Sequence, residues 1–160
     1  MKVPIQPENE TLRLEYLNSL NLLDSEENVD IDRITDFIAK LFCVPIALVS
    51  IVDSHRQWFK SKVGLDVFET PRDISFCGHA ILDTKPLIVT NALFDERFLD
   101  NPLVTGEPYI RFYAGAPLIA KTGVILGTLC IIDTQPRDFS ENDTQILVKL
   151  ASDVMQLIEN

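Results

Sequence analysis

A thiol and an imidazole stand two positions apart in the stretch "SFCGHA", at Cys77 and His79. Such a pair could act as nucleophile and base, hold a metal ion, anchor a cofactor or serve packing alone. If the stretch is helical from Phe76, successive residues are rotated by about 100°. Cys77 and His79 then point to nearly opposite sides of the helix, so they cannot bind one metal ion or exchange a proton. We therefore predict no catalytic residue and no metal site.

The same helical geometry places Phe76 and His79 on one side and Cys77 on another. In one interpretation, Cys77 is a small buried residue and the His79 ring is hydrogen-bonded near the start of the helix. In the other, His79 and Phe76 face a ligand pocket, where His79 could donate or accept and change its charge near neutral pH. The residues alone leave both interpretations open.

Arg111 and Tyr113 alternate along one face of a predicted strand, which directs both side chains to the same side of a sheet. Arg111 could hold an anionic or carbonyl group of a ligand while Tyr113 stacks on it. Alternatively, Arg111 pairs with Asp95 or Glu96 and fixes the preceding loop. Either interpretation places Arg111 and Tyr113 beside the pocket.

A long polar loop over residues 91–108 includes "FDERFLDNPLVTGEP". Loops above about 12 residues are usually functional or mobile. We expect this one to cover the pocket, with Phe94, Asp95 and Asn101 among the residues that line it. The alternative is a surface connection that Phe94, Phe98 and Leu103 hold in place.

Helical periodicity surrounds these residues at both ends of the chain. Spacings of three and four predict helices over residues 8–23 and 31–42. A capping-box pattern at Ser140–Asp143 predicts the start of a last helix. That helix carries an apolar stripe, which either packs on the sheet or forms a seam in a dimer. The stripe consists of Leu147, Leu150, Val154 and Leu157.

Short apolar runs rich in β-branched residues predict the strands between these helices. They cover residues 46–53, 57–64, 86–90, 109–120 and 124–133. Trp58 alternates with Phe59 on the second run, and we assign it to the core or an interface. We predict an α+β fold with a central antiparallel sheet of five to six strands. The terminal helices are expected on one face, and the short helix and long loop over a pocket on the other.

Composition limits the classes of partner. The 160 residues carry a net charge of −10, yet residues 37–132 hold nine acidic and nine basic residues, so the central part favours a ligand of neither sign. No basic stripe is present for nucleic acid, and no apolar run suits membrane insertion. Three widely spaced cysteines and the lack of a signal sequence predict a cytoplasmic protein with free thiols.

Several separated stretches, in this order, resemble a GAF domain of the bacterial sensory type. They are "PIALVSIVD", "RQWFKS", "ETPRDISFCGHAI", "DERFLDNPLV", "IRFYAGAPL" and "LGTLCIID". The resemblance runs over about residues 12–158 of a single domain that spans 1–160, with 1–11 as an N-terminal extension. Similar modules stand at the N-terminus of sensor histidine kinases and diguanylate cyclases.

The resemblance implies a small-molecule-binding regulatory module in signal transduction, not an enzyme. Its ligand, a small organic molecule, would bind between the sheet and the helix-and-loop side. The terminal helices would form a homodimer and pass the signal to a downstream signalling domain or protein, since no effector domain follows in this sequence. Related bilin-binding domains attach a chromophore through a Cys followed directly by His, and Gly78 argues against that attachment here.

Two alternatives remain open. One is a GAF-fold free methionine-R-sulfoxide reductase, although no stretch matches the cysteine motif of that family. The other is a dimerising module with an empty pocket.

Overall fold

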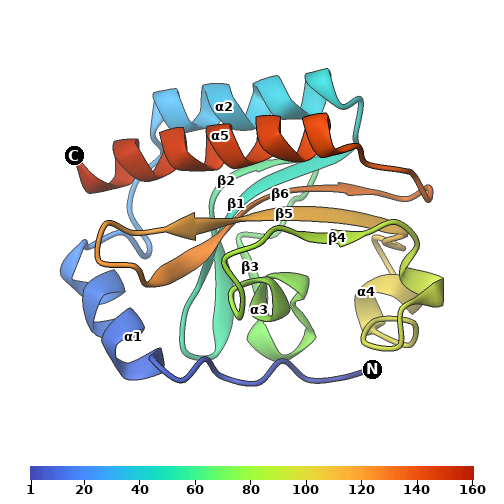
Figure 1. The fold of residues 1–160 in the computed structure, drawn as a ribbon, viewed down its shortest axis with the longest axis horizontal. Coiled ribbons are helices and arrows are strands. Elements are labelled where there is room, and N and C mark those ends of the chain that lie inside the picture. The colour runs from blue at the N-terminus through green and yellow to red at the C-terminus, as the bar shows by residue number, and fades with distance from the viewer.

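The computed structural model describes residues 1–160 and contains one six-stranded antiparallel sheet (Figure 1). Its strands follow the spatial order β3-β2-β1-β6-β5-β4. The strands are β1 (Ile46–Val52), β2 (Arg56–Val63), β3 (Glu69–Pro71), β4 (Leu87–Val89), β5 (Phe112–Ile119) and β6 (Ile125–Asp133). The predicted α+β class and antiparallel sheet are confirmed.

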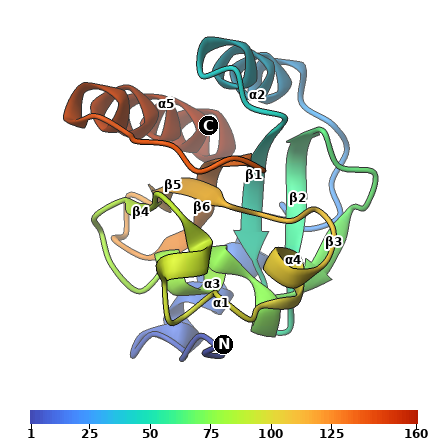
Figure 2. The same cartoon turned by 90° about the vertical axis from the view of Figure 1, so that its right-hand side faces the viewer.

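Helices α2 (Val29–Leu41) and α5 (Glu141–Glu159) lie side by side across one face of the sheet, as Figures 1 and 2 show. The Asn28 side chain caps α2 by accepting from the amides of Asp30 and Ile31, at 2.9 and 3.1 Å. Ser140 and Asp143 form the predicted capping box of α5. The amphipathic patterns of both segments therefore cover the sheet as expected.

The other face carries short elements (Figure 2): α3 (Phe76–Ala80), α4 (Pro102–Thr105) and the 3₁₀ turns η1 (Arg72–Ile74) and η2 (Ala92–Phe94). Helix α1 (Glu10–Ser19) lies apart from α2 and α5, at the end of the sheet where β1 ends and β6 begins. No helix combines the length and the apolar character that crossing a bilayer requires.

Alternation along the central strands separates two hydrophobic cores. On β5, Phe112 and Ala114 belong to the core beneath α2 and α5, whereas Tyr113 belongs to the core beneath α3. Trp58 is buried in the first core and Phe59 in the second. The prediction that Trp58 lies in the core is confirmed.

The apolar stripe of α5 faces the sheet. Leu147 and Val154 are fully buried in the core, and Leu150 and Leu157 are half-buried against it. The hypothesis of an intermolecular seam therefore needs correction for Leu147 and Val154, because these side chains are already enclosed within one chain. The simpler interpretation, packing on the sheet, accounts for the spacing.

Two boundaries and one strand differ from the predictions. The stretch over residues 75–85 has a helical pattern, but α3 ends at Ala80, and a turn in which Asp83 accepts from the amide of Lys85 follows it. Strand β5 begins only at Phe112, because the chain turns through a left-handed conformation at Tyr109 (φ 59°). The three-residue strand β3 was not predicted, since its residues are exposed or half-exposed and show no apolar alternation.

Candidate functional site

A cavity of about 590 Å³ lies on the α3 side of the sheet, between the strands and two loops. We call it the sheet cavity. Its walls are mostly apolar, and they come from β1, β2, β3, β6, the loop between β2 and β3, and the segment around α4. The lining residues are Ile46, Leu48, Gln57, Phe59, Gly64, Leu65, Asp66, Val67, Thr70, Leu103, Glu107, Pro108, Tyr109, Ile110 and Ile132.

Strand alternation builds the floor of the sheet cavity. Ile46 and Leu48 of β1 point to this face. Ala47 and Val49, which alternate with them, point to the helical face. Phe59 of β2 and Ile132 of β6 extend the floor on the two neighbouring strands. A floor made from three hydrogen-bonded strands is rigid, so any change of shape in this cavity falls to its loops.

A buried polar group closes one end of the sheet cavity. The Gln57 side chain accepts from Ser50 Oγ at 3.0 Å and donates from Nε2 to Thr70 Oγ1 at 2.7 Å. The only charged residues that line the cavity are Asp66 and Glu107. Because no basic side chain is present there, the chemistry of the cavity favours a largely apolar ligand without phosphate groups.

The predicted pocket residues of α3 come together, but in a packed core. The Phe76 ring stacks on Phe98 with a centroid distance of 4.0 Å and lies 5.2 Å from the Tyr113 ring. All three side chains are almost completely buried. None of the eight candidate pocket residues lines the sheet cavity; they are Phe76, Cys77, His79, Phe94, Asp95, Asn101, Arg111 and Tyr113.

Cys77 belongs to a buried cluster of thiols and hydroxyls. Its Sγ lies 3.2 Å from Tyr113 Oη and 3.1 Å from Thr128 Oγ1, and the Cys130 thiol lies alongside. Burial, together with the neighbouring thiols, raises the pKa of Tyr113 well above its ordinary value. Cys77 therefore ties α3 to β5 and β6.

Arg111 does not form the expected ion pair with Asp95 or Glu96. It donates from Nη1 to the carbonyls of Val104 and Ile110, at 2.9 and 3.0 Å. Asp95 instead pairs with its near neighbour Arg97, at 2.6 Å. Arg111 thus holds the segment after α4, which contributes the outer wall of the sheet cavity, through backbone carbonyls.

Three other predicted residues, Asn101, Phe94 and His79, lie in separate places. Asn101 is buried, caps α4 by accepting from the Leu103 amide, and donates to the carbonyl of Ile74 at 3.0 Å. Phe94 is 87% exposed and faces solvent. His79 is half-buried, with its Nε2 2.9 Å from the Lys2 carbonyl oxygen and its ring against Phe98.

Sequence reasoning missed most of the cavity walls because they lie in irregular segments. Leu65 and Val67 follow Gly64, whose φ of +84° places it in the left-handed region that glycine favours. The sequence offered one signal for these walls, namely two apolar residues in a loop directly after a glycine. Tyr109 and Ile110 were predicted as strand and form a wall instead.

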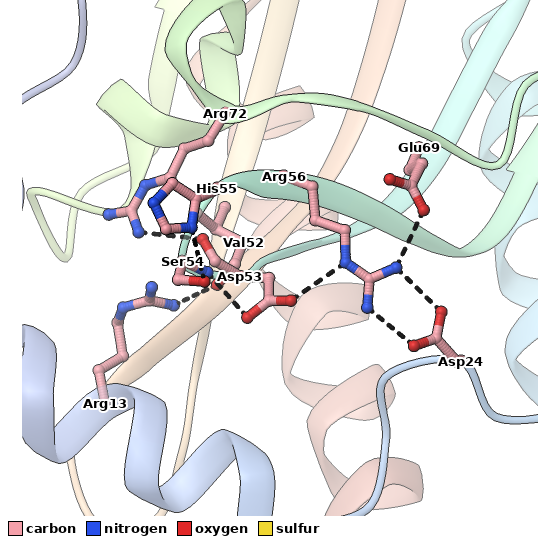
Figure 3. A network of polar contacts seen from close by, with 9 residues as sticks. All are labelled: Arg13, Asp24, Val52, Asp53, Ser54, His55, Arg56, Glu69 and Arg72. Carbon is pink, nitrogen blue, oxygen red and sulfur yellow. Dashed lines mark hydrogen bonds and ion pairs between the residues drawn. The ribbon is translucent and has the colours of Figure 1, made fainter.

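A network of arginines and carboxylates fastens the end of β1 to its surroundings (Figure 3). Arg56 pairs with Asp24, Asp53 and Glu69 at 2.8–3.0 Å. Beside it, Arg72 donates to the Asp53 carbonyl and Arg13 to the Val52 carbonyl, at 3.0 and 2.6 Å.

Glu10, on the first turn of α1, joins Arg13 and Arg72. Arg13 Nε donates to its carboxylate at 2.8 Å, and both Nη atoms of Arg72 contact the same group. Burial alone would raise the pKa of Glu10, but the hydrogen bonds from Arg72 and Arg13 outweigh it and hold the pKa below its ordinary value.

Comparison with known proteins gives consistent matches. The model of the GAF domain family matches residues 29–158. A cyclic di-GMP phosphodiesterase of Pseudomonas aeruginosa is 45% identical over 159 residues, which are 99% of this chain and 27% of that protein's length. The chain thus spans about a quarter of this relative.

Solved structures share the fold. The GAF domain of an Acinetobacter phosphoenolpyruvate-protein phosphotransferase superposes with a TM-score of 0.67 at 21% identity, over 92% of this chain and 93% of that one. A free methionine-R-sulfoxide reductase of Neisseria meningitidis, in complex with its substrate, gives 0.68 at 17% identity, over 99% and 96%. At these identities the likeness establishes the fold alone.

Thiol accessibility tests the buried cluster. Cys43 is exposed, whereas Cys77 and Cys130 are buried. A thiol reagent should label one cysteine per native chain and all three in denaturant, because the native core excludes the reagent. Cys43→Ser should abolish native labelling. Fast labelling of a second thiol in the folded protein would contradict the packing described for Cys77.

Acid unfolding tests the Glu10 cluster. Since the pKa of Glu10 is lower in the folded than in the unfolded chain, the stability it contributes is present above its unfolded value of about 4.3 and is lost as the pH falls toward its folded value. Glu10→Gln leaves two buried guanidinium groups unneutralised and should cost about 3 kcal/mol at pH 7. It should also flatten the decline of the unfolding free energy below pH 5, measured by urea titration.

The matched control is Glu15→Gln, an exposed glutamate on the same helix. It should change the unfolding free energy by less than about 0.5 kcal/mol. Equal effects of the two substitutions would refute the stabilising role of the Glu10 cluster.

Proposed function

Because this chain belongs to the GAF domain family, we propose that it is a regulatory module that binds a small, uncharged and largely apolar molecule in the sheet cavity. The single observation that carries the proposal is the cavity itself. It has a volume of about 590 Å³, a rigid three-strand floor and walls made of loops. Such a volume lies in the range of small-molecule sites, which are mostly apolar with a few placed polar groups. Gln57 and Thr70 supply those groups.

The walls provide a way for a ligand to change the shape of the chain. Leu65 and Val67 lie on one loop, and Tyr109 and Ile110 on the segment that Arg111 holds through carbonyls. A ligand that draws these two segments together would favour one of their arrangements. We expect the effect to reach α2, because Gly64, which begins the first of these loops, lies directly against Pro45 in the segment between α2 and β1.

We further propose that α2 and α5 pass the signal on through a homodimer. Phe37 and Leu41 of α2 are four residues apart and 52% and 46% exposed, and Val148 of α5 is 44% exposed. Together with Val29, which is 64% exposed, these side chains, and not the buried Leu147 and Val154, are the exposed apolar groups that α2 and α5 offer to a partner. The identity to a cyclic di-GMP phosphodiesterase supports a regulatory role in signalling of that kind.

A reductase activity is the second candidate, because Cys77 and Cys130 lie together in the core. Cys77 is only 2% exposed, and Cys130 is fully buried, so a sulfoxide substrate would have to displace Tyr113 or Phe76 to reach either thiol. A thioredoxin-coupled assay with free methionine-R-sulfoxide decides this point. Turnover that disappears in Cys77→Ser would replace the binding proposal with catalysis.

A thermal-shift screen of uncharged metabolites tests the proposed function. At least one compound should stabilise the native chain saturably, because binding to the folded state alone raises the melting temperature. Leu65→Trp fills the sheet cavity from its loop and should weaken this binding by at least about tenfold, or 1.4 kcal/mol.

Leu93→Trp is the matched control, since it adds the same ring at a half-exposed loop position outside the cavity. Binding should be unchanged in this variant. A screen without any hit, or a hit that Leu65→Trp and Leu93→Trp bind equally well, would overturn the proposal.

A further inference from the structure

The N-terminal segment, residues 1–9, runs as an extended strap past α3 (Figure 1). Three polar contacts hold its first residues: the Lys2 amide donates to the Arg97 carbonyl at 3.0 Å, His79 contacts the Lys2 carbonyl, and the terminal amino group pairs with Asp100. Pro4 packs against Gly78 of α3, and the Pro7 carbonyl accepts from the Glu10 amide at 3.1 Å. The apolar side chains Val3 and Ile5 of the strap are 53% and 72% exposed. This strap can therefore lift without breaking either hydrophobic core.

A second cavity, of about 570 Å³, lies between the strap, the end of α3 and the turn before β6. We call it the strap cavity. It shares no residue with the sheet cavity. Its lining residues are Ile5, Gln6, Pro7, Glu8, Asn9, Arg13, Ile81, Leu82, Asp83, Thr84, Gly123 and Ile125.

Arg13 is the deepest charged residue of the strap cavity and is fully buried. Its Nε donates to Glu10 and its Nη1 to the Val52 carbonyl, but its Nη2 has no hydrogen-bond acceptor in the chain. A buried donor without an acceptor costs about 1–3 kcal/mol, and more when the group is charged. Native structures keep few such groups, and they call for a specific explanation.

The charges do not balance within the buried group of Arg13, Arg72 and Glu10, although the adjacent Arg56 pairs with three carboxylates. Arg13 and Arg72 share one carboxylate, that of Glu10, which leaves one positive charge in excess within this buried group. The nearby carboxylate of Asp53 already accepts hydrogen bonds from Arg56 Nε at 3.0 Å and from the Ser54 amide at 2.8 Å (Figure 3). An anion beside Arg13 Nη2 would compensate the excess charge and satisfy the free donor.

The start of α1 borders the strap cavity at Asn9 and has further donors without an acceptor in the chain. Asn9, the N-cap residue, lines the strap cavity and makes no side-chain capping bond. The amides of Thr11 and Leu12 find no acceptor in the chain. A helix start with free amides attracts anions through its partial positive charge.

We propose that the strap cavity binds a small organic monocarboxylate, with its carboxylate at Arg13 and the start of α1. The apolar part would lie against Ile81, Leu82 and Ile125. Glu8 and Asp83 also line the cavity, and they disfavour a dianion such as phosphate. Since Arg13 Nη2 is itself buried, the strap moves aside to admit the ligand and then closes over it.

Isothermal titration of the full chain with hexanoate tests this proposal. Hexanamide serves as the uncharged match and inorganic phosphate as the dianion, all at one ionic strength. Hexanoate should bind at one site, and hexanamide and phosphate at least about tenfold more weakly. Leu65→Trp should leave hexanoate binding unchanged, which separates this site from the sheet cavity.

Gln6→Glu places a negative charge on the exposed strap inside the cavity and should weaken hexanoate binding by about tenfold. Gln135→Glu makes the same charge change at an exposed position beyond the opposite end of β6 and should have no effect. Arg13→Met should abolish binding, with the fold checked by circular dichroism. If Arg13→Met does not fold, the pair of glutamine variants decides the outcome.

Equal affinities for hexanoate and hexanamide would overturn the proposal. Equal affinities of the Gln6→Glu and Gln135→Glu variants for hexanoate would do the same. Phosphate binding as strong as that of hexanoate would replace the monocarboxylate with a general anion.

Discussion

The central strands β1, β6 and β5 bury both of their faces, and this constraint decides where the other elements lie. Side chains alternate across a strand, so a strand that is apolar at every position needs a covering layer on each side. Two long amphipathic helices provide one layer. The other consists of α3, α4, two 3₁₀ turns and loops, and such short segments cover a sheet less completely. The sheet cavity follows from this difference between the two layers.

The second layer depends on tethers that are mostly backbone or buried polar contacts. Asn101 connects the start of α4 to the carbonyl of Ile74, and Arg111 holds the following segment through two carbonyls. Cys77 fixes α3 on the sheet beside Tyr113 and Thr128. Side chains that resemble catalytic or ligand-binding groups in the sequence therefore position the walls of the cavity.

Regular elements could be predicted because local physical rules decide them. The capping box at Ser140 and the alternation of Trp58 with Phe59 correspond to features of the structure. The candidate site was less predictable. One of the two interpretations of Arg111 was an ion pair with Asp95 or Glu96, but Asp95 pairs with Arg97, which lies only two residues away.

The cavity walls were the least predictable part. Leu65 and Tyr109 meet at one cavity through the path of two irregular loops, which no periodicity encodes. The unpaired donor of Arg13 was equally hidden, since it depends on which acceptors the folded chain brings to each nitrogen. Both the shape of the cavity walls and the unpaired donor depend on contacts between segments that are distant in the sequence.

Isoleucine methyl NMR can show directly whether a ligand enters the sheet cavity. Ile46, Ile110 and Ile132 line the cavity, whereas Ile31, Ile38 and Ile51 lie in the core beneath α2 and α5. Adding the low-mass extract of a bacterial lysate should shift the methyl signals of the first three in a saturable manner and produce smaller shifts in the second three. Unchanged signals at all six methyl groups, or shifts confined to the helical core, would contradict the account.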